Sequence, residues 1–104
     1  MNLKQLKEDF VKKYISLGSE KFYKFLILYA LNKIILIEKE EFNGAFPNIE
    51  FLNIYDKFII LYRREGDKIY LNIAKIFRKA AHKIYRVMLK KNITSQNDRF
   101  LNLV

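Results

Sequence analysis

The sequence predicts a small all-α bundle of about four helices, and three observations lead to this fold class. The chain has 104 residues, the size of one ordinary domain. Its residues are 51% apolar, and nine Phe and seven Tyr supply bulk for a core. Only three glycines and one proline interrupt the chain, so its elements are few and long, which favours helices over many short strands.

The first predicted helix covers residues 3–16. Its apolar residues recur at helical spacing on one face, while its lysines project away from that face. The apolar face consists of Leu3, Leu6, Phe10, Tyr14 and Leu17. Gly18 follows and supplies the left-handed conformation that commonly ends a helix. Ser19 is then expected to be the N-cap of the next helix.

The second predicted helix runs from Ser19 to about Glu41 and is apolar nearly all round. Such a pattern is expected of a helix at the centre of a bundle. Residues 34–37 are largely β-branched and are also compatible with a short strand. The segment 43–47, Asn-Gly-Ala-Phe-Pro, is the clearest loop in the chain.

The third segment, residues 48–64, has two interpretations. As a helix it places most of its large apolar residues on one face and its polar residues on the other. As strands, residues 57–72 would form a β-hairpin across the Glu65-Gly66-Asp67 turn, and the fold would be an α+β protein resembling a winged helix. We retain this hairpin as the alternative fold.

The fourth segment, residues 68–91, decides between these interpretations. Its apolar residues lie within about 60° of one line at 100° per residue. This helical phase extends back past Asn72 without a break, and a strand ending at Leu71 would have no reason to keep it. We therefore predict a helix from Lys68 to Lys91, with Gly66 ending the third helix and Asp67 as the N-cap of the fourth. Residues 1–92 then form the helical domain, and residues 93–104 are a tail that docks on the domain or on a partner.

Positive charge is concentrated in this last helix. Between Lys68 and Asn97 the chain has eight basic residues and no acidic one, so this segment contributes +8 of the net charge of +9. A solvated helix face usually mixes the two signs, because like charges at i, i+4 are unfavourable. Lys75 and Lys79, for example, form such a like-charged pair. A helix that keeps this repulsion is expected to use its charged surface, and the positive charge indicates an anionic partner.

The predicted binding surface follows from the helical wheel, on which the basic residues cluster opposite the core. The residues assigned to it are Lys68, Lys75, Arg78, Lys79, His82, Lys83, Arg86, Lys90 and Lys91. We expect this surface to contact the phosphates of DNA or RNA with weak sequence specificity. Asn72, Arg78 and Arg86 are the side chains able to read bases, and Tyr85 could stack on one. A homodimer is expected because one such helix has a short footprint.

Three other interpretations of the basic surface remain. It could bind an acidic protein, which would make the chain a non-enzymatic adaptor or accessory subunit. The acidic residues of the segment 38–41 in the same protein are one such partner. It could contact an anionic membrane, although Ala80 and Ala81 on the apolar side suit helix packing better than lipid insertion. It could also be a solvated face with no function.

Several kinds of chemistry are excluded by composition. The chain has no cysteine and one histidine, which excludes disulfides, thiolate catalysis and Cys- or His-rich metal sites. We expect no metal, no cofactor and no enzymatic activity. The most apolar stretch, residues 25–37, is too short for a membrane span, which needs about 20 residues. The N-terminus lacks the apolar run of a signal peptide, so we expect a cytoplasmic protein.

One pair of residues resembles a known catalytic motif. Arg78 and His82, in the segment Arg-Lys-Ala-Ala-His, are similar to the Arg…His motif of HEPN-type ribonucleases. Those are small four-helix bundles that cut RNA as dimers, so the resemblance implies RNA cleavage with His82. The family usually places four to six residues between the two, and this chain has three.

Overall fold

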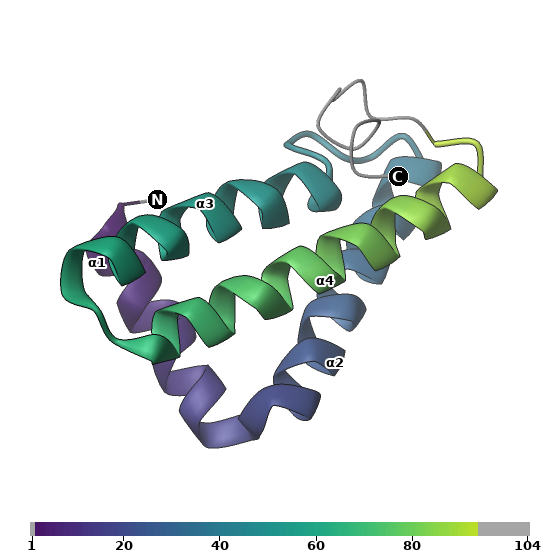
Figure 1. The fold of residues 1–104 in the computed structure, drawn as a ribbon. Coiled ribbons are helices and arrows are strands. Elements are labelled where there is room, and N and C mark those ends of the chain that lie inside the picture. The colour runs from purple at the N-terminus through teal and green to yellow at the C-terminus, as the bar shows by residue number, and fades with distance from the viewer. Residues whose placement is uncertain (1, 94–104) are drawn as a thin grey trace.

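The computed structural model describes residues 2–93, and every regular element in this range is helical (Figure 1). A short α1 (Leu3–Leu6) continues as a π-helix, η1 (Lys7–Val11), and then as α2 (Lys12–Glu38). Two further helices follow, α3 (Pro47–Glu65) and α4 (Lys68–Lys90). The predicted all-α class is therefore confirmed. The alternative hairpin at residues 57–72 is wrong, because these residues form the end of α3, a tight corner and the start of α4.

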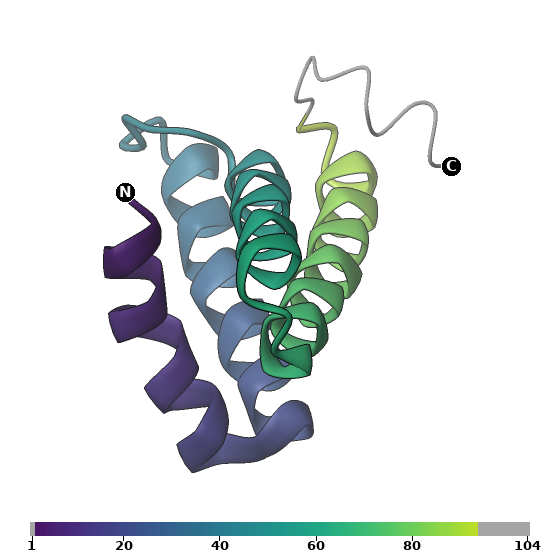
Figure 2. The same cartoon turned by 60° about the vertical axis from the view of Figure 1, so that its left-hand side comes forward.

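The helices α3 and α4 form an antiparallel pair and lie side by side along their lengths (Figures 1 and 2). The most extensive contact of α4 is with α3, and α2 packs against α4 much more than against α3. The N-terminal arm, residues 3–17, lies beside α2 in Figure 2. α4 thus stands in the middle of the bundle, in contact with η1, α2 and α3.

The helix α2 is interrupted at Gly18. Its φ of 79° and ψ of 170° are not helical, and this region of backbone conformation is essentially restricted to glycine. The predicted interruption of the helix at Gly18 is confirmed, but its ψ of 170° is extended and not that of the left-handed helical conformation expected from the sequence. Gly18 itself, rather than Ser19, takes the non-helical position that precedes the second part of α2. The Ser19 hydroxyl lies 3.2 Å from the Tyr14 hydroxyl and so ties the two sides of the break together.

The corner between α3 and α4 follows the predicted capping. Gly66 is left-handed with φ 75°, and its N–H donates to the Tyr62 carbonyl at 2.8 Å. The Asp67 carboxylate accepts a hydrogen bond from the Ile69 N–H at 3.0 Å and caps α4. Gly66 ends α3 and Asp67 caps α4 directly after it, so α4 is helical from Lys68 and its helical phase is unbroken.

Phe77 is the centre of the core. Its ring contacts Phe10 of η1 at 5.1 Å between ring centres, Phe22 of α2 at 5.8 Å, and Phe51 and Phe58 of α3 at 5.6 and 6.0 Å. All of these separations are in the range of favourable aromatic pairs. One side chain of α4 therefore connects the N-terminal arm, α2 and α3.

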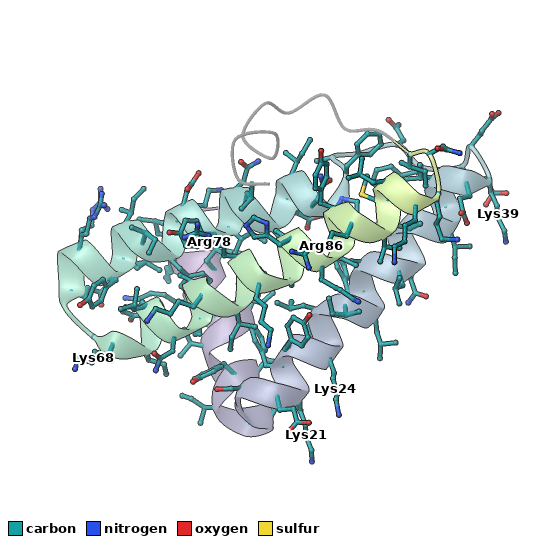
Figure 3. All side chains as sticks on the ribbon, turned by 45° about the vertical axis from the view of Figure 1, so that its right-hand side comes forward. Lys21, Lys24, Lys39, Lys68, Arg78 and Arg86 are labelled. Atoms are coloured by element: carbon teal, nitrogen blue, oxygen red, sulfur yellow. The ribbon has the colours of Figure 1, made fainter. Side chains whose placement is uncertain are left out.

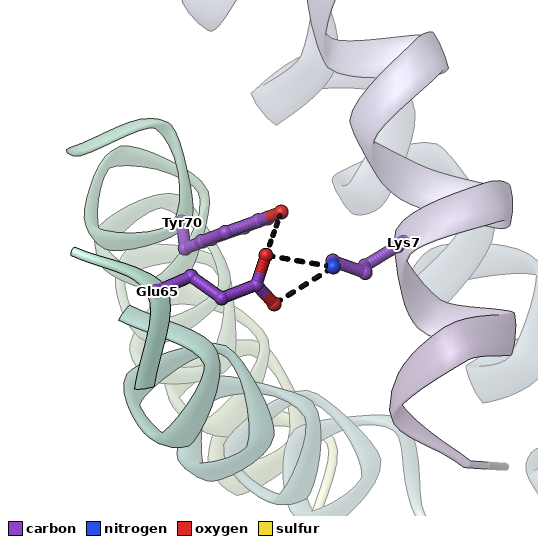
Figure 4. A network of polar contacts seen from close by, with 3 residues as sticks. All are labelled: Lys7, Glu65 and Tyr70. Atoms are coloured by element: carbon purple, nitrogen blue, oxygen red, sulfur yellow. Dashed lines mark hydrogen bonds and ion pairs between the residues drawn. The ribbon is translucent and has the colours of Figure 1, made fainter. Parts of the chain in front are cut away.

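A polar network fastens the N-terminal arm to the α3–α4 corner (Figure 4). The Lys7 ammonium lies 2.9 and 2.7 Å from the two carboxylate oxygens of Glu65, and the Tyr70 hydroxyl donates to the same carboxylate at 3.3 Å. The hydrogen bond to Glu65 raises the pKa of Lys7. Lys7 is thus held in its charged form next to a carboxylate that lies 58 residues further along the chain.

One expectation about α2 is wrong. Its nearly continuous apolar surface predicted a central helix, but Leu28 is 63% exposed and Ile35 is 47% exposed. A domain of this size leaves a large fraction of its surface in water and cannot enclose every helix. The central position belongs to α4, and α2 lies at the edge with apolar side chains uncovered.

We expect Phe77→Ala to remove about 3–5 kcal/mol from the free energy of unfolding. The residue is fully buried, and the substitution leaves a cavity where α4 meets three other elements. Typical domains have only about 5–15 kcal/mol of stability, so the variant should unfold at much lower denaturant. Phe42→Ala, in the half-buried loop before α3, is the control and should cost far less. Equal losses in urea titrations would contradict the central role of Phe77.

We expect Gly18→Ala to destabilise the protein by about 1–3 kcal/mol through backbone strain alone. A Cβ at this position meets no atom within 4 Å, so no steric clash contributes. Gly44→Ala is the matched control, since Gly44 does not have a positive φ. Thermal unfolding of both variants measures the difference, and an unchanged midpoint for Gly18→Ala would show that the break tolerates an L residue.

Candidate nucleic-acid interface

The packing of α4 places its cations on one exposed side. Nine of its residues are buried toward the other helices, Ala74, Phe77, Ala80, Ala81 and Ile84 among them. The opposite side carries seven exposed basic residues, which we call the cationic face. They are Lys68, Lys75, Arg78, Lys79, Lys83, Arg86 and Lys90. Figure 3 shows Lys68, Arg78 and Arg86 at successive points along α4.

These cations are not neutralised by carboxylates. Within residues 2–93, none of the seven side chains of the cationic face makes an ion pair. The helix contains no acidic residue, and Asp67 at its N-cap is engaged with the backbone. The like charges at i, i+4 therefore oppose one another along the helix.

Neutral aromatic rings position two of the cations instead. The Lys79 ammonium lies 4.6 Å from the ring centre of Tyr23 on α2, and the Arg78 guanidinium lies 5.9 Å from that of Tyr55 on α3. Each such contact contributes about 0.5–1 kcal/mol at an exposed site. A ring orders a cation but leaves its full charge available, whereas a carboxylate would cancel it. The face is thus flanked by one tyrosine from each neighbouring helix.

His82 is a half-buried member of the predicted surface. Burial is the main cause that lowers its pKa, and the positive charges of Arg78 and Arg86 lower it further. His82 therefore adds no positive charge to the face at neutral pH.

Two predicted participants lie elsewhere. The Lys91 ammonium is 2.9 Å from a carboxylate oxygen of Glu38, at the end of α2, so part of its charge is already compensated. This pair is the one contact between the predicted basic surface and the acidic segment 38–41 within the described residues. Tyr85 is only 6% exposed and belongs to the core, so it cannot stack on a base. Asn72, Arg78 and Arg86 are exposed, as their proposed contact with bases requires.

Sequence reasoning missed the contribution of α2 to this surface. Lys24 and Lys83 line the same shallow groove between α2 and α4. Figure 3 shows Lys21 and Lys24 on α2 below α4, and Lys39 at the far end of α2. No local pattern in the sequence links Lys24 with Lys83, because their proximity arises only when the two helices pack.

A separate pocket lies between η1, α2 and α3 and encloses about 390 Å³. Four phenylalanines form much of its wall, and its polar side chains already have partners. The Tyr29 hydroxyl donates to Glu50 at 2.9 Å, and burial together with this bond raises the pKa of Tyr29 to about 12. Asp9 accepts from the Gln5 amide at 3.1 Å. Its polar groups are thus engaged in interactions within the fold.

The described residues contain no group of three or more His, Cys, Asp or Glu side chains arranged to hold a metal ion. In the same part of the chain, every helix is too short or too polar to cross a membrane. The predicted tail begins with Ile93, which packs against the core. Its remaining residues, 94–104, lie outside the described range.

Comparisons with protein-family models, with curated proteins and with solved structures found no match to this chain. Function must therefore be inferred from the chemistry and geometry of the surface.

We expect His82 to make stability depend on pH in a defined direction. Its pKa is lowered on folding, so the unfolded chain binds more protons than the folded protein below about pH 6.5. Stability should therefore fall as the pH decreases through this range. His82→Gln removes the titrating imidazole. As the pH falls from about 7.5 to 5.5, the free energy of unfolding should decrease more for the wild type than for the variant. Denaturant titrations at each pH measure it, and parallel pH profiles would contradict the lowered pKa.

Proposed function

We propose that this protein binds DNA or RNA through the cationic face of α4. The observation that carries the proposal is a line of seven exposed cations that make no ion pair within residues 2–93. Such a line gains binding free energy by neutralising phosphates and releasing their counterions. Because α4 is fixed by its buried side, the cations are presented with little reorganisation.

The dimensions of the face suit a segment of nucleic acid backbone. Fifteen residues separate Lys75 from Lys90, which corresponds to about 22 Å along a helix. This length matches about six or seven nucleotide steps at roughly 3.4 Å of helix axis each. We expect four or five phosphate contacts along it. The tyrosines beside Lys79 and Arg78 limit the motion of these two cations without reducing their charge.

The composition of the face favours nucleic acid over an acidic protein. Stable protein interfaces depend on a few desolvated apolar or aromatic anchors surrounded by a polar rim. Within α4 the one exposed large apolar side chain is Leu89, which is 45% exposed and lies near the end of the helix, and the tyrosines beside Lys79 and Arg78 are half-buried. A surface of cations without anchors binds a polyanion better than a folded protein.

Sequence specificity should be weak. Contacts to phosphates fix position but carry no information on sequence. Asn72, Arg78 and Arg86 are the exposed side chains of α4 suited to base edges, and Arg78 is partly committed to the ring of Tyr55. We therefore expect similar affinities for unrelated sequences of the same length.

The direct test measures affinity for labelled duplex DNA, single-stranded DNA and RNA by fluorescence anisotropy. Log affinity should fall with log salt between about 50 and 200 mM, with a slope of roughly −4 for duplex DNA, since each phosphate contact contributes about −0.9. If none of the three probes binds at low salt, the proposed function is wrong.

Charge reversal locates the surface. The double variant Lys79→Glu/Arg86→Glu should bind at least about tenfold more weakly and lose about 2 from the salt slope. Lys4→Glu/Lys12→Glu makes the same change in net charge on the exposed N-terminal arm and is the matched control. Equal losses in the two double variants would show that total charge, and not the cationic face, determines affinity.

A further inference from the structure

The uncovered apolar side of α2 is the second unusual surface of this molecule. Leu28, Leu31 and Ile35 follow one another at helical spacing and form what we call the α2 stripe. Leu28 and Ile35 are 63% and 47% exposed, and Leu31 is half-buried. A helix that is apolar on every side is normally covered on every side. The stripe is therefore a surface that residues 2–93 leave uncovered.

A groove adjoins the stripe on the side of α4. It encloses about 310 Å³ and is lined by Tyr23, Lys24, Ile27, Leu28 and Lys83. Its lining is apolar because the two lysines contribute their aliphatic stems. One patch of the molecule thus offers both protruding apolar side chains and a recess beside them. A two-fold symmetric interface requires a patch that fits itself, and a protrusion beside a recess meets this requirement.

We propose that the α2 stripe binds a second copy of this chain, with the two α2 helices antiparallel and a two-fold axis near Leu31. In this arrangement a residue of one copy faces the residue of the other copy for which the two residue numbers sum to about 62, twice the number of Leu31. Ile35 of each copy then faces Ile27 and the groove of the other copy. Ile35, near the end of the stripe in one copy, thus fits the groove near the start of the stripe in the other copy.

The charges at the two ends of the stripe support the same register. Lys21 and Lys24 lie near the start of the stripe with one acidic residue, Glu20, which pairs with Lys24 at 3.2 Å. Glu38, Glu40 and Glu41 lie at its end with one basic residue, Lys39, so the start is net positive and the end is net negative. The antiparallel alignment centred on Leu31 places Lys24 opposite Glu38 of the second copy. A parallel alignment would place like charges together. Glu38 also contacts Lys91 of its own chain, so Lys24 would join an existing pair.

The symmetry has a consequence for the cationic face. In an antiparallel pair the two-fold axis lies in the interface, passes between the two α2 helices and is perpendicular to both, so an element displaced along that axis stays on the same side in both copies. Because α4 lies beside the groove edge of the stripe, both copies of α4 fall on one side of the dimer. This consequence rests on the proposed function, whereas the dimer does not. One polyanion would then contact two cationic faces.

The oligomeric state tests the proposal without any nucleic acid. Light scattering after size exclusion, from about 10 to 200 µM, should give twice the 12.6 kDa of one chain. Leu28→Glu and Ile35→Glu should each give the mass of one chain, with helical content retained in circular dichroism. Ile15→Glu is the matched control, since Ile15 is 66% exposed but lies before the Gly18 break. It should remain dimeric.

Cysteine cross-linking tests the register. The native chain contains no cysteine, so single substitutions report one position at a time. Leu31→Cys lies next to the axis and should form a disulfide between two copies under mild oxidation. Lys24→Cys and Ile15→Cys should not, because neither residue meets its own copy. The pair Lys24→Glu with Glu38→Lys supplies a second test: each change should weaken the dimer, and both together should restore it.

The possible outcomes separate the two proposals. A monomer at every concentration overturns the dimer, whether the stripe is covered by another protein or by residues 94–104. A dimer that survives Leu28→Glu and Ile35→Glu shows that another surface pairs. Cross-linking through position 24 but not 31 overturns the register. If the dimer forms and no nucleic acid binds, the proposed function fails alone, and a monomer that binds nucleic acid overturns only the dimer.

Discussion

The contact of the Phe77 ring with rings from three other elements is the interaction on which the rest of this structure depends. Phe10, Phe22, Phe51 and Phe58 all meet it, although they come from η1, α2 and α3. The backbones of α2 and α3 approach each other at few points, so side chains join these helices, the Phe77 cluster and the Tyr29–Glu50 hydrogen bond among them. The aromatic cluster therefore orients α4 by holding one of its sides at the centre of the bundle. Once that side is fixed, the helical repeat alone directs the lysines and arginines of α4 into water.

The same geometry explains how the protein maintains a cationic surface that repels itself. Each like-charged pair at i, i+4 costs a few tenths of a kcal/mol, whereas each large buried side chain on the other side of α4 contributes about 1.5–3 kcal/mol. Burial outweighs repulsion, so the sequence of the exposed side is free to serve binding. The tyrosines that flank Lys79 and Arg78 show how a cation can be ordered without a counter-ion.

The parts of the fold that sequence predicts are those determined within one helix. The unbroken phase of α4 identified both its buried side and its corner with α3, because capping at Gly66 and Asp67 is local. The errors concern what neighbouring helices cover. Tyr85 lies at the edge of the apolar side of α4, and only the packed structure shows that it is buried. The apolar surface of α2 was interpreted as central because a helical wheel shows which residues are apolar and not what covers them.

That error about α2 is informative because the sequence pattern is that of a covered helix, and within residues 2–93 no other segment covers its apolar side. The pattern of α2 departs from that of α4, whose apolar and polar sides are sharply divided. Selection for solubility alone would place polar residues at Leu28 and Ile35, since both are largely exposed in one chain. A second α2 helix, reversed in direction, satisfies the apolar stripe, the groove and the opposed end charges in a single register. In the proposed dimer the two short cationic faces would lie on the same side, so the cationic surface of two chains would be longer than that of one.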